Sequence, residues 1–105
     1  MESESRTRIL TVLRALEPAL RARGVVHVTV FGSVARGDDT PNSDVDLALD
    51  LAPGSAPDGF QFTAYVEEIR RSLAAALSRS VDLVILPARR QELAQSLRRE
   101  AIAAF

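Results

Sequence analysis

Residues 25–51 read VVHVTVFGSVARGDDTPNSDVDLALDL, and this stretch decides the fold. Its first part, VVHVTVF, is rich in β-branched and aromatic residues and predicts a strand that ends at Phe31. Residues 32–42 are rich in turn-forming residues and predict a connection with one short helical turn after Ser33. In residues 43–51, SDVDLALDL, apolar and polar residues alternate, which predicts a second strand with one buried face.

Apolar residues at helical spacing place helices on both sides of this stretch. They predict a helix over residues 5–23, kinked or restarted at Pro18, and a second helix over residues 60–78. Residues 81–86 predict a short apolar strand, and residues 88–104 predict a last helix. This order of elements predicts an α+β fold in which helices flank a small mixed β-sheet.

The length and composition narrow the range of functions. A chain of 105 residues forms one domain, residues 1–105, without room for a separate substrate-binding domain. The absence of cysteine excludes disulfides and Cys-based zinc sites, and the single histidine, His27, excludes a His-rich metal cluster. All 13 basic residues are arginine, which excludes catalysis by a Schiff-base lysine. With a polar N-terminal segment and no apolar run of about 20 residues, we expect a cytoplasmic protein with no signal peptide and no membrane span.

The charges are unevenly distributed along the chain. The net charge of −1 divides into +3 over residues 1–37, −8 over residues 38–69 and +4 over residues 70–105. An acidic middle between basic ends is a poor footprint for a general nucleic-acid groove, so nucleic acid is not an expected partner. The same layout suits a cation site with arginines nearby.

Three aspartates are the candidate metal ligands. Asp44 and Asp46 are two residues apart on a predicted strand, so both side chains point to one face at a spacing of roughly 6.5–7 Å. Two carboxylates placed in this way repel each other unless a cation lies between them, and a hard divalent cation is the natural occupant. Asp82 is the charged residue of the third strand and reaches the same site if the strands are neighbours. The alternatives are a solvated strand face for the first two and a solvated strand start for Asp82.

The turn after the first strand is a candidate phosphate site. Gly32 permits close approach of the backbone, and the amides of the turn together with the Ser33 hydroxyl can hold phosphate oxygens. The alternative is an ordinary strand-ending turn. Arg36 can neutralise phosphate charge, or it can pair with Asp38 or Asp39 on the surface.

Gly32-Ser33, ten intervening residues and then Asp44-Val45-Asp46 resemble a known signature. It is the Gly-Ser-x10-Asp-x-Asp signature of the DNA polymerase beta-like nucleotidyltransferase superfamily. The fuller stretch GSVARGDDTPNSDVDLAL resembles the GSxARG…SDxDL form of its smallest members, the minimal nucleotidyltransferases (MNT domains), which pair with HEPN proteins in toxin–antitoxin modules. The resemblance covers almost the whole chain and implies the polymerase beta-like nucleotidyltransferase fold. Val34 departs from the larger polar or basic residue of many members, and this leaves the catalytic positions untouched.

The resemblance also implies a role for each site residue. Asp44 and Asp46 would bind two Mg²⁺ ions, and Asp82 would complete the catalytic metal site and help to activate the attacking hydroxyl. Ser33, together with the glycine before it, would hold the β- and γ-phosphates of ATP. Arg36 would be a phosphate or structural contact.

From this resemblance we expect an Mg²⁺-dependent enzyme that transfers AMP from ATP to a protein hydroxyl. The implied acceptor is a tyrosine of a partner HEPN toxin, which would make the chain an antitoxin acting in a homo- or hetero-oligomer. One alternative is a non-catalytic antitoxin that neutralises its partner by occlusion. Another is a nucleotidyltransferase subunit for a small molecule or RNA that gains its acceptor site by oligomerising.

Overall fold

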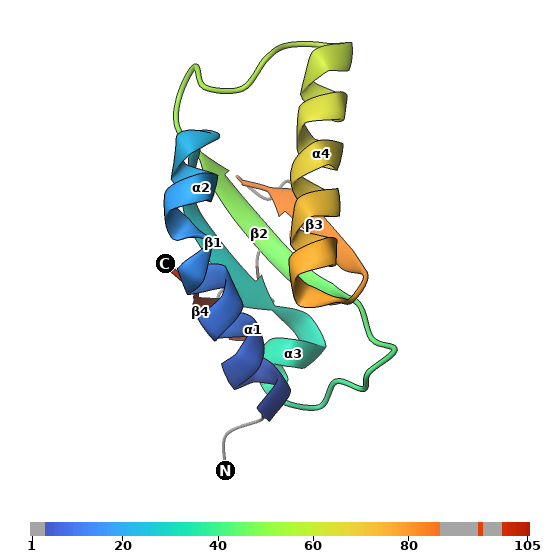
Figure 1. Cartoon of the computed structure of the whole chain (residues 1–105). Helices are drawn as coiled ribbons and strands as arrows, with labels where there is room; N and C mark the ends of the chain where they lie inside the picture. The colour runs from blue at the N-terminus through green and yellow to red at the C-terminus, as the bar shows by residue number, and fades with distance from the viewer. Residues whose placement is uncertain (1–3, 87–94, 96–99) are drawn as a thin grey trace.

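A mixed β-sheet forms the centre of the computed structural model, which describes residues 4–86, 95 and 100–105 (Figure 1). In this part of the chain the sheet has four strands in the order β3-β2-β1-β4. Their bounds are Val25–Phe31 for β1, Val45–Leu51 for β2, Val81–Ile85 for β3 and Ile102–Ala103 for β4. The predicted α+β fold with a mixed sheet is confirmed.

The connections between strands explain why the sheet is mixed. Strands β1 and β2 pair in antiparallel fashion and are joined by the short helix α3, Gly32–Arg36, and a loop. Strands β2 and β3 are parallel, because the long helix α4, Phe60–Leu77, carries the chain back across the sheet between them. Strand β4 pairs antiparallel with the other edge of β1.

Two further helices lie before the first strand, on the same side of the sheet as α4 (Figure 1). Helix α1 spans Glu4–Ala15 and helix α2 spans Glu17–Ala22. The helix predicted over residues 5–23 is therefore interrupted, as expected from Pro18, which lies in the first turn of α2, where it needs no amide hydrogen. In the described part of the chain no helix has the length and apolar character needed to cross a membrane.

The core lies between these helices and the sheet. Its side chains come from the helical positions spaced by three or four residues and from alternate positions of the strands. The largest fully buried ones include Ile9, Leu13, Val28, Val30, Val45, Leu47, Leu49, Ile69 and Leu73. Because Val45 and Leu47 point into this core, Asp44 and Asp46 emerge on the opposite face of the sheet.

The predicted last helix, residues 88–104, is wrong at its C-terminal end. Residues Ile102–Ala103 form strand β4, in which Ala103 is the register partner of Thr29. The Nε atom of Arg14 donates a hydrogen bond of 2.9 Å to the carbonyl of Ala104 and fixes this end against α1. The spacing of Leu93, Leu97 and Ala101 predicted a helix, but at residues 102–103 pairing with the open edge of β1 outweighs this weak local preference. Most of the predicted helix lies outside the described residues.

Candidate active site

The turn between β1 and α3 brings the backbone directly against a carboxylate. Strand β1 ends at Phe31, whose register partner on β2 is Asp46, and helix α3 begins at the next residue. Gly32 has a φ of +70°, a conformation that side chains disfavour, and a Cβ atom added there would overlap Oδ2 of Asp46. Glycine is therefore required at this position for the carboxylate to lie against the turn.

Helix α3 is a single short turn with defined ends. The amides of Gly37 and Asp38 both donate to the Ser33 carbonyl, at 2.9 and 3.1 Å, and Gly37 ends the helix in the left-handed conformation. The Ser33 side chain is half-buried, and its hydroxyl makes no hydrogen bond within the described part of the chain. This hydroxyl is thus free to bind a ligand beside Gly32.

The sheet register brings the three predicted aspartates to one edge of the site. Asp46 of β2 and Asp82 of β3 are direct partners in the parallel pair. Asp44 comes immediately before β2, two residues from Asp46. The sequence-based expectation that the two strands are neighbours in one sheet is therefore correct.

The electrostatics of Asp46 reflect this crowding. Burial raises the pKa of its carboxyl group, and the charges of Asp82 and Asp44 raise it further. Arg36 acts in the opposite direction, with a smaller effect. Neighbouring carboxylates disfavour one another's ionised form, and a cation bound between them stabilises that form.

The donor chemistry of this edge fits a magnesium ion, since carboxylate oxygens are the ligands that hard divalent cations take. The side chains of Asp44 and Asp82 are exposed, so both are accessible to solvent ions. Within residues 4–86, 95 and 100–105, however, no group of three or more His, Asp and Glu side chains is arranged to hold a metal ion. The backbone therefore brings the three aspartates together, whereas their side chains do not yet form a complete ligand set.

The structure places Arg36 in the surface pairing that was one of its two predicted roles. Its Nε donates to Asp38 at 3.2 Å, and its second partner is Glu100, at 3.0 Å, rather than Asp39. The Arg36 side chain is 45% exposed, and exposed pairs of this kind contribute little free energy. Such a pair can open at little cost, so the phosphate role of Arg36 stays a prediction.

One arrangement near the site was missed by sequence reasoning. Asp39 forms an ion pair of 2.8 Å with Arg79, and the two side chains are only 3% and 6% exposed. Burial alone would raise the pKa of Asp39, but hydrogen bonds from Arg79 and Ser5 and the charge of Arg79 lower it overall. The sequence shows an arginine three residues before Asp82, which could have indicated a charged partner near the site, but nothing in the sequence reveals that this arginine is buried.

Family comparison adds an independent observation to this geometry. A family model described as Polymerase beta, Nucleotidyltransferase matches residues 15–103. The chain belongs to the polymerase beta nucleotidyltransferase family. The matched region of this nucleotidyltransferase contains the Gly-Ser turn, α4 and all three candidate aspartates, so the resemblance seen in the sequence is confirmed.

Individual relatives place this nucleotidyltransferase among the small members of the family. It is 34% identical over 95 residues to the protein adenylyltransferase MntA of Thermococcus cleftensis, a match that covers 90% of each chain. A solved minimal nucleotidyltransferase is 32% identical, with a TM-score of 0.64 over 89% of this chain and 93% of that one. A toxin–antitoxin crystal structure with AMP-PNP is 26% identical, with a TM-score of 0.69 over 90% of this chain and 72% of that one.

Proposed function

We propose that this nucleotidyltransferase transfers AMP from ATP to a hydroxyl group of a partner protein, a tyrosine of a HEPN toxin, and so acts as its antitoxin. The similarity to a protein adenylyltransferase supports the reaction, and the similarity to a toxin–antitoxin structure with AMP-PNP supports both the nucleotide and the partner. The observation that carries the proposal is the contact of Asp46 with the Gly32 turn. It supports the proposal because the candidate phosphate-binding turn, Gly32 and Ser33, lies next to one of the candidate carboxylates.

In this proposal each site residue has a distinct role. Asp44, Asp46 and Asp82 would hold two magnesium ions, which supply neutralisation of the phosphate charge when bound. Ser33 donates its hydroxyl proton to a β- or γ-phosphate oxygen, and Gly32 lets the backbone approach the phosphates closely. Asp82, whose side chain is exposed, accepts the proton of the attacking hydroxyl in this proposal.

The reaction balances with these groups. The acceptor oxygen attacks the α-phosphorus of ATP and forms a new phosphorus–oxygen bond. The bond from the α-phosphorus to the bridging oxygen breaks, and pyrophosphate leaves with the electron pair. Positioning of the triphosphate and charge neutralisation supply most of the acceleration, as in other phosphoryl-transfer reactions.

A labelling experiment with a matched pair of variants tests the proposal. The chain is incubated with ATP, Mg²⁺ and the protein encoded by the neighbouring gene as the partner, and the mass of the partner is measured. We expect the partner to gain AMP with wild-type protein and with Asp50→Asn, a change on the same strand away from the site. Asp46→Asn is expected to reduce the rate by at least about 100-fold, because it removes one member of a unit that acts together.

Two outcomes would contradict the proposal. One is a partner whose mass stays unchanged under all conditions. The other is equal labelling by Asp46→Asn and wild type, since the carboxylate of Asp46 would then not take part in the reaction. If the Asp44→Asn/Asp46→Asn double variant still neutralises the toxin, occlusion rather than transfer explains the antitoxin effect.

A further inference from the structure

A buried arginine, which is not one of the predicted site residues, holds the loop that leads into Asp44. Arg79 lies between α4 and β3, and its Nη1 donates to Oδ2 of Asp39 at 2.8 Å. Its Nη2 donates to two carbonyls of the same loop, that of Thr40 at 2.8 Å and that of Ser43 at 2.7 Å. One planar guanidinium thus spans the loop at three points, a geometry that a lysine cannot reproduce.

Asp44 is bracketed by the segment that contains this arginine. The last carbonyl that Arg79 holds belongs to the peptide entering Asp44. On the other side, the Val45 amide donates to the Ser80 carbonyl at 2.9 Å. Ser80 follows Arg79 directly and precedes Asp82 by two residues. Residues 79–80, which lead into Asp82, therefore hold the backbone on both sides of Asp44.

We infer that Arg79 is a positioning residue that fixes Asp44 relative to Asp82, an inference that rests on the proposed function of those aspartates. Its side chain is 94% buried, and its Nε has no hydrogen-bond partner within the described residues. A buried ion pair with an unsatisfied donor is a weak source of stability compared with apolar packing. The guanidinium instead fixes the position of the loop. It donates hydrogen bonds to the Ser5 hydroxyl of α1 and to three groups of the loop, which are the Asp39 carboxylate and the carbonyls of residues 40 and 43.

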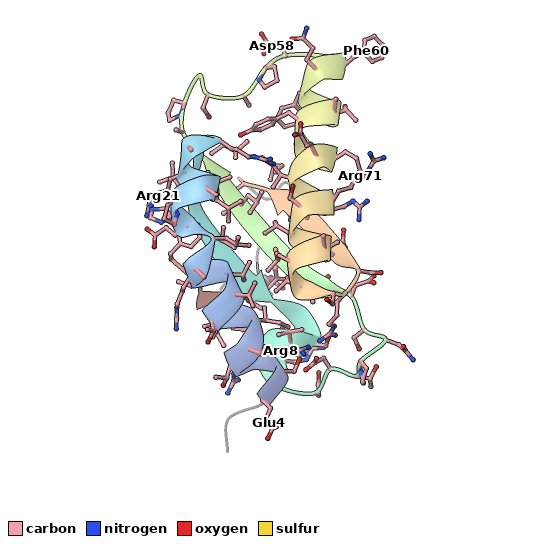
Figure 2. The ribbon with its side chains drawn as sticks, viewed as in Figure 1. Glu4, Arg8, Arg21, Asp58, Phe60 and Arg71 are labelled. Carbon is pink, nitrogen blue, oxygen red and sulfur yellow. The ribbon has the colours of Figure 1, made fainter. Side chains whose placement is uncertain are left out.

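The variant Arg79→Lys tests this inference. Lysine keeps the charge opposite Asp39 but cannot hold the Thr40 and Ser43 carbonyls together. We expect the kcat of AMP transfer to fall by about 10- to 100-fold, the usual effect of losing a residue that orients a ligand, with the KM for ATP within about threefold of wild type. The matched control is Arg71→Lys on the solvent side of α4 (Figure 2), where the side chain is 76% exposed and kcat should not change.

Hydrogen exchange gives a second measurement that does not depend on activity. In Arg79→Lys the amides of residues 38–45 should exchange about tenfold faster, while those of β1 keep their protection, because only the loop is released. A kcat within twofold of wild type, or exchange that rises equally in β1 and α4, would show a merely structural role and overturn the inference. If the wild-type protein transfers no AMP, the proposed function fails, whereas the exchange pattern still decides whether Arg79 fixes this loop.

Discussion

At the scale of single residues, Gly32 meets two separate requirements. Its φ of +70° is a conformation that costs other residues roughly 1–2 kcal/mol. In addition, the space where a Cβ would lie is occupied by the Asp46 carboxylate. The first requirement concerns stability, and the second concerns the position of a proposed catalytic group, so the two can be separated experimentally.

The variants Gly32→Ala and Gly54→Ala make this separation. Gly54 has a nearly identical φ of +74°, but a Cβ there has no heavy atom within 4 Å. We expect both variants to lose about 1–2 kcal/mol of unfolding free energy from backbone strain. Only Gly32→Ala should also lose AMP transfer, by about 100-fold, because a displacement of the order of 1 Å at a reacting group has this effect. Urea denaturation and the labelling assay measure the two effects, and equal activity of both variants would contradict the role of the Asp46 contact.

At the scale of elements, the C-terminal end of α4 contains a residue in an unfavourable conformation. Ser78 caps this helix with a φ of 55°. Among the described residues other than glycine, it is the one with a positive φ. Left-handed caps of this kind are usually glycine, which adopts the conformation without strain. The strained residue comes directly before Arg79, at the point where the chain turns toward β3.

Replacing Ser78 with glycine is therefore expected to stabilise the protein. The relief of strain, roughly 1–2 kcal/mol, exceeds the added entropy of the unfolded chain, so we expect a net gain of about 0.5–1 kcal/mol. Thermal unfolding measures the gain. Ser80→Gly, which removes a serine two positions away without relieving a positive φ, should lower the stability, and a similar loss in Ser78→Gly would show that strain is not the controlling factor.

A helix or strand could be predicted from the sequence when a pattern within its own residues determines it. The periodicity of Ile9, Leu13, Ile69 and Leu73 predicted the long helices, because a helix presents residues of that spacing to the sheet. Strand β4 could not be predicted, because two residues carry no periodic signal and pair only where β1 offers a free edge. Elements defined by a local pattern are thus predictable, and those defined by a distant neighbour are not.

The same distinction applies to the residues of the candidate site, some of which could be predicted from the sequence and some of which could not. Gly32, Ser33 and the three aspartates were identified from their types and spacing, and the sheet register places Asp46 beside Asp82 as expected. The buried pair of Asp39 with Arg79 was missed, because 40 residues separate its partners and only the folded chain brings them together. The functional roles of all these residues stay predictions.

At the scale of the whole molecule, folding mixes the three charged regions of the sequence. Arg79, Arg23 and Arg36 from the basic regions reach acids of the acidic middle in ion pairs. By contrast, Asp44, Asp46 and Asp82 form no ion pair with any residue that the structure describes. The three candidate metal ligands therefore keep negative charge that no described arginine neutralises in an ion pair.

This uncompensated charge predicts a specific dependence of stability on pH. Because the pKa of Asp46 is raised in the folded protein, folding favours the protonated form, and this stabilisation is fully present only below the ordinary carboxyl value of 3.8. It is lost as pH rises through the higher pKa of the folded state. In buffer with EDTA, Asp46→Asn should therefore be more stable than wild type at pH 7, and the difference should shrink as the pH falls toward 3.8.

Urea denaturation at several pH values measures this effect, with Asp50→Asn as the control for removing an acid from β2. Added Mg²⁺ should stabilise the wild type and have less effect on Asp46→Asn, because a ligand that binds only the folded state raises its stability. A loss of stability in Asp46→Asn at pH 7 would mean that the attraction of Arg36 outweighs the burial and the two neighbouring carboxylates.

The parallel pairing of β2 with β3 has a consequence for biosynthesis. Asp82 reaches Asp46 only after α4 has crossed the sheet, and non-local pairing of this kind forms late. A ribosome-bound chain that has emerged only as far as Leu77 already carries the phosphate turn and two carboxylates, yet it lacks the third. If the three aspartates act together as proposed, the growing polypeptide cannot transfer AMP from cellular ATP until its third strand docks against β2.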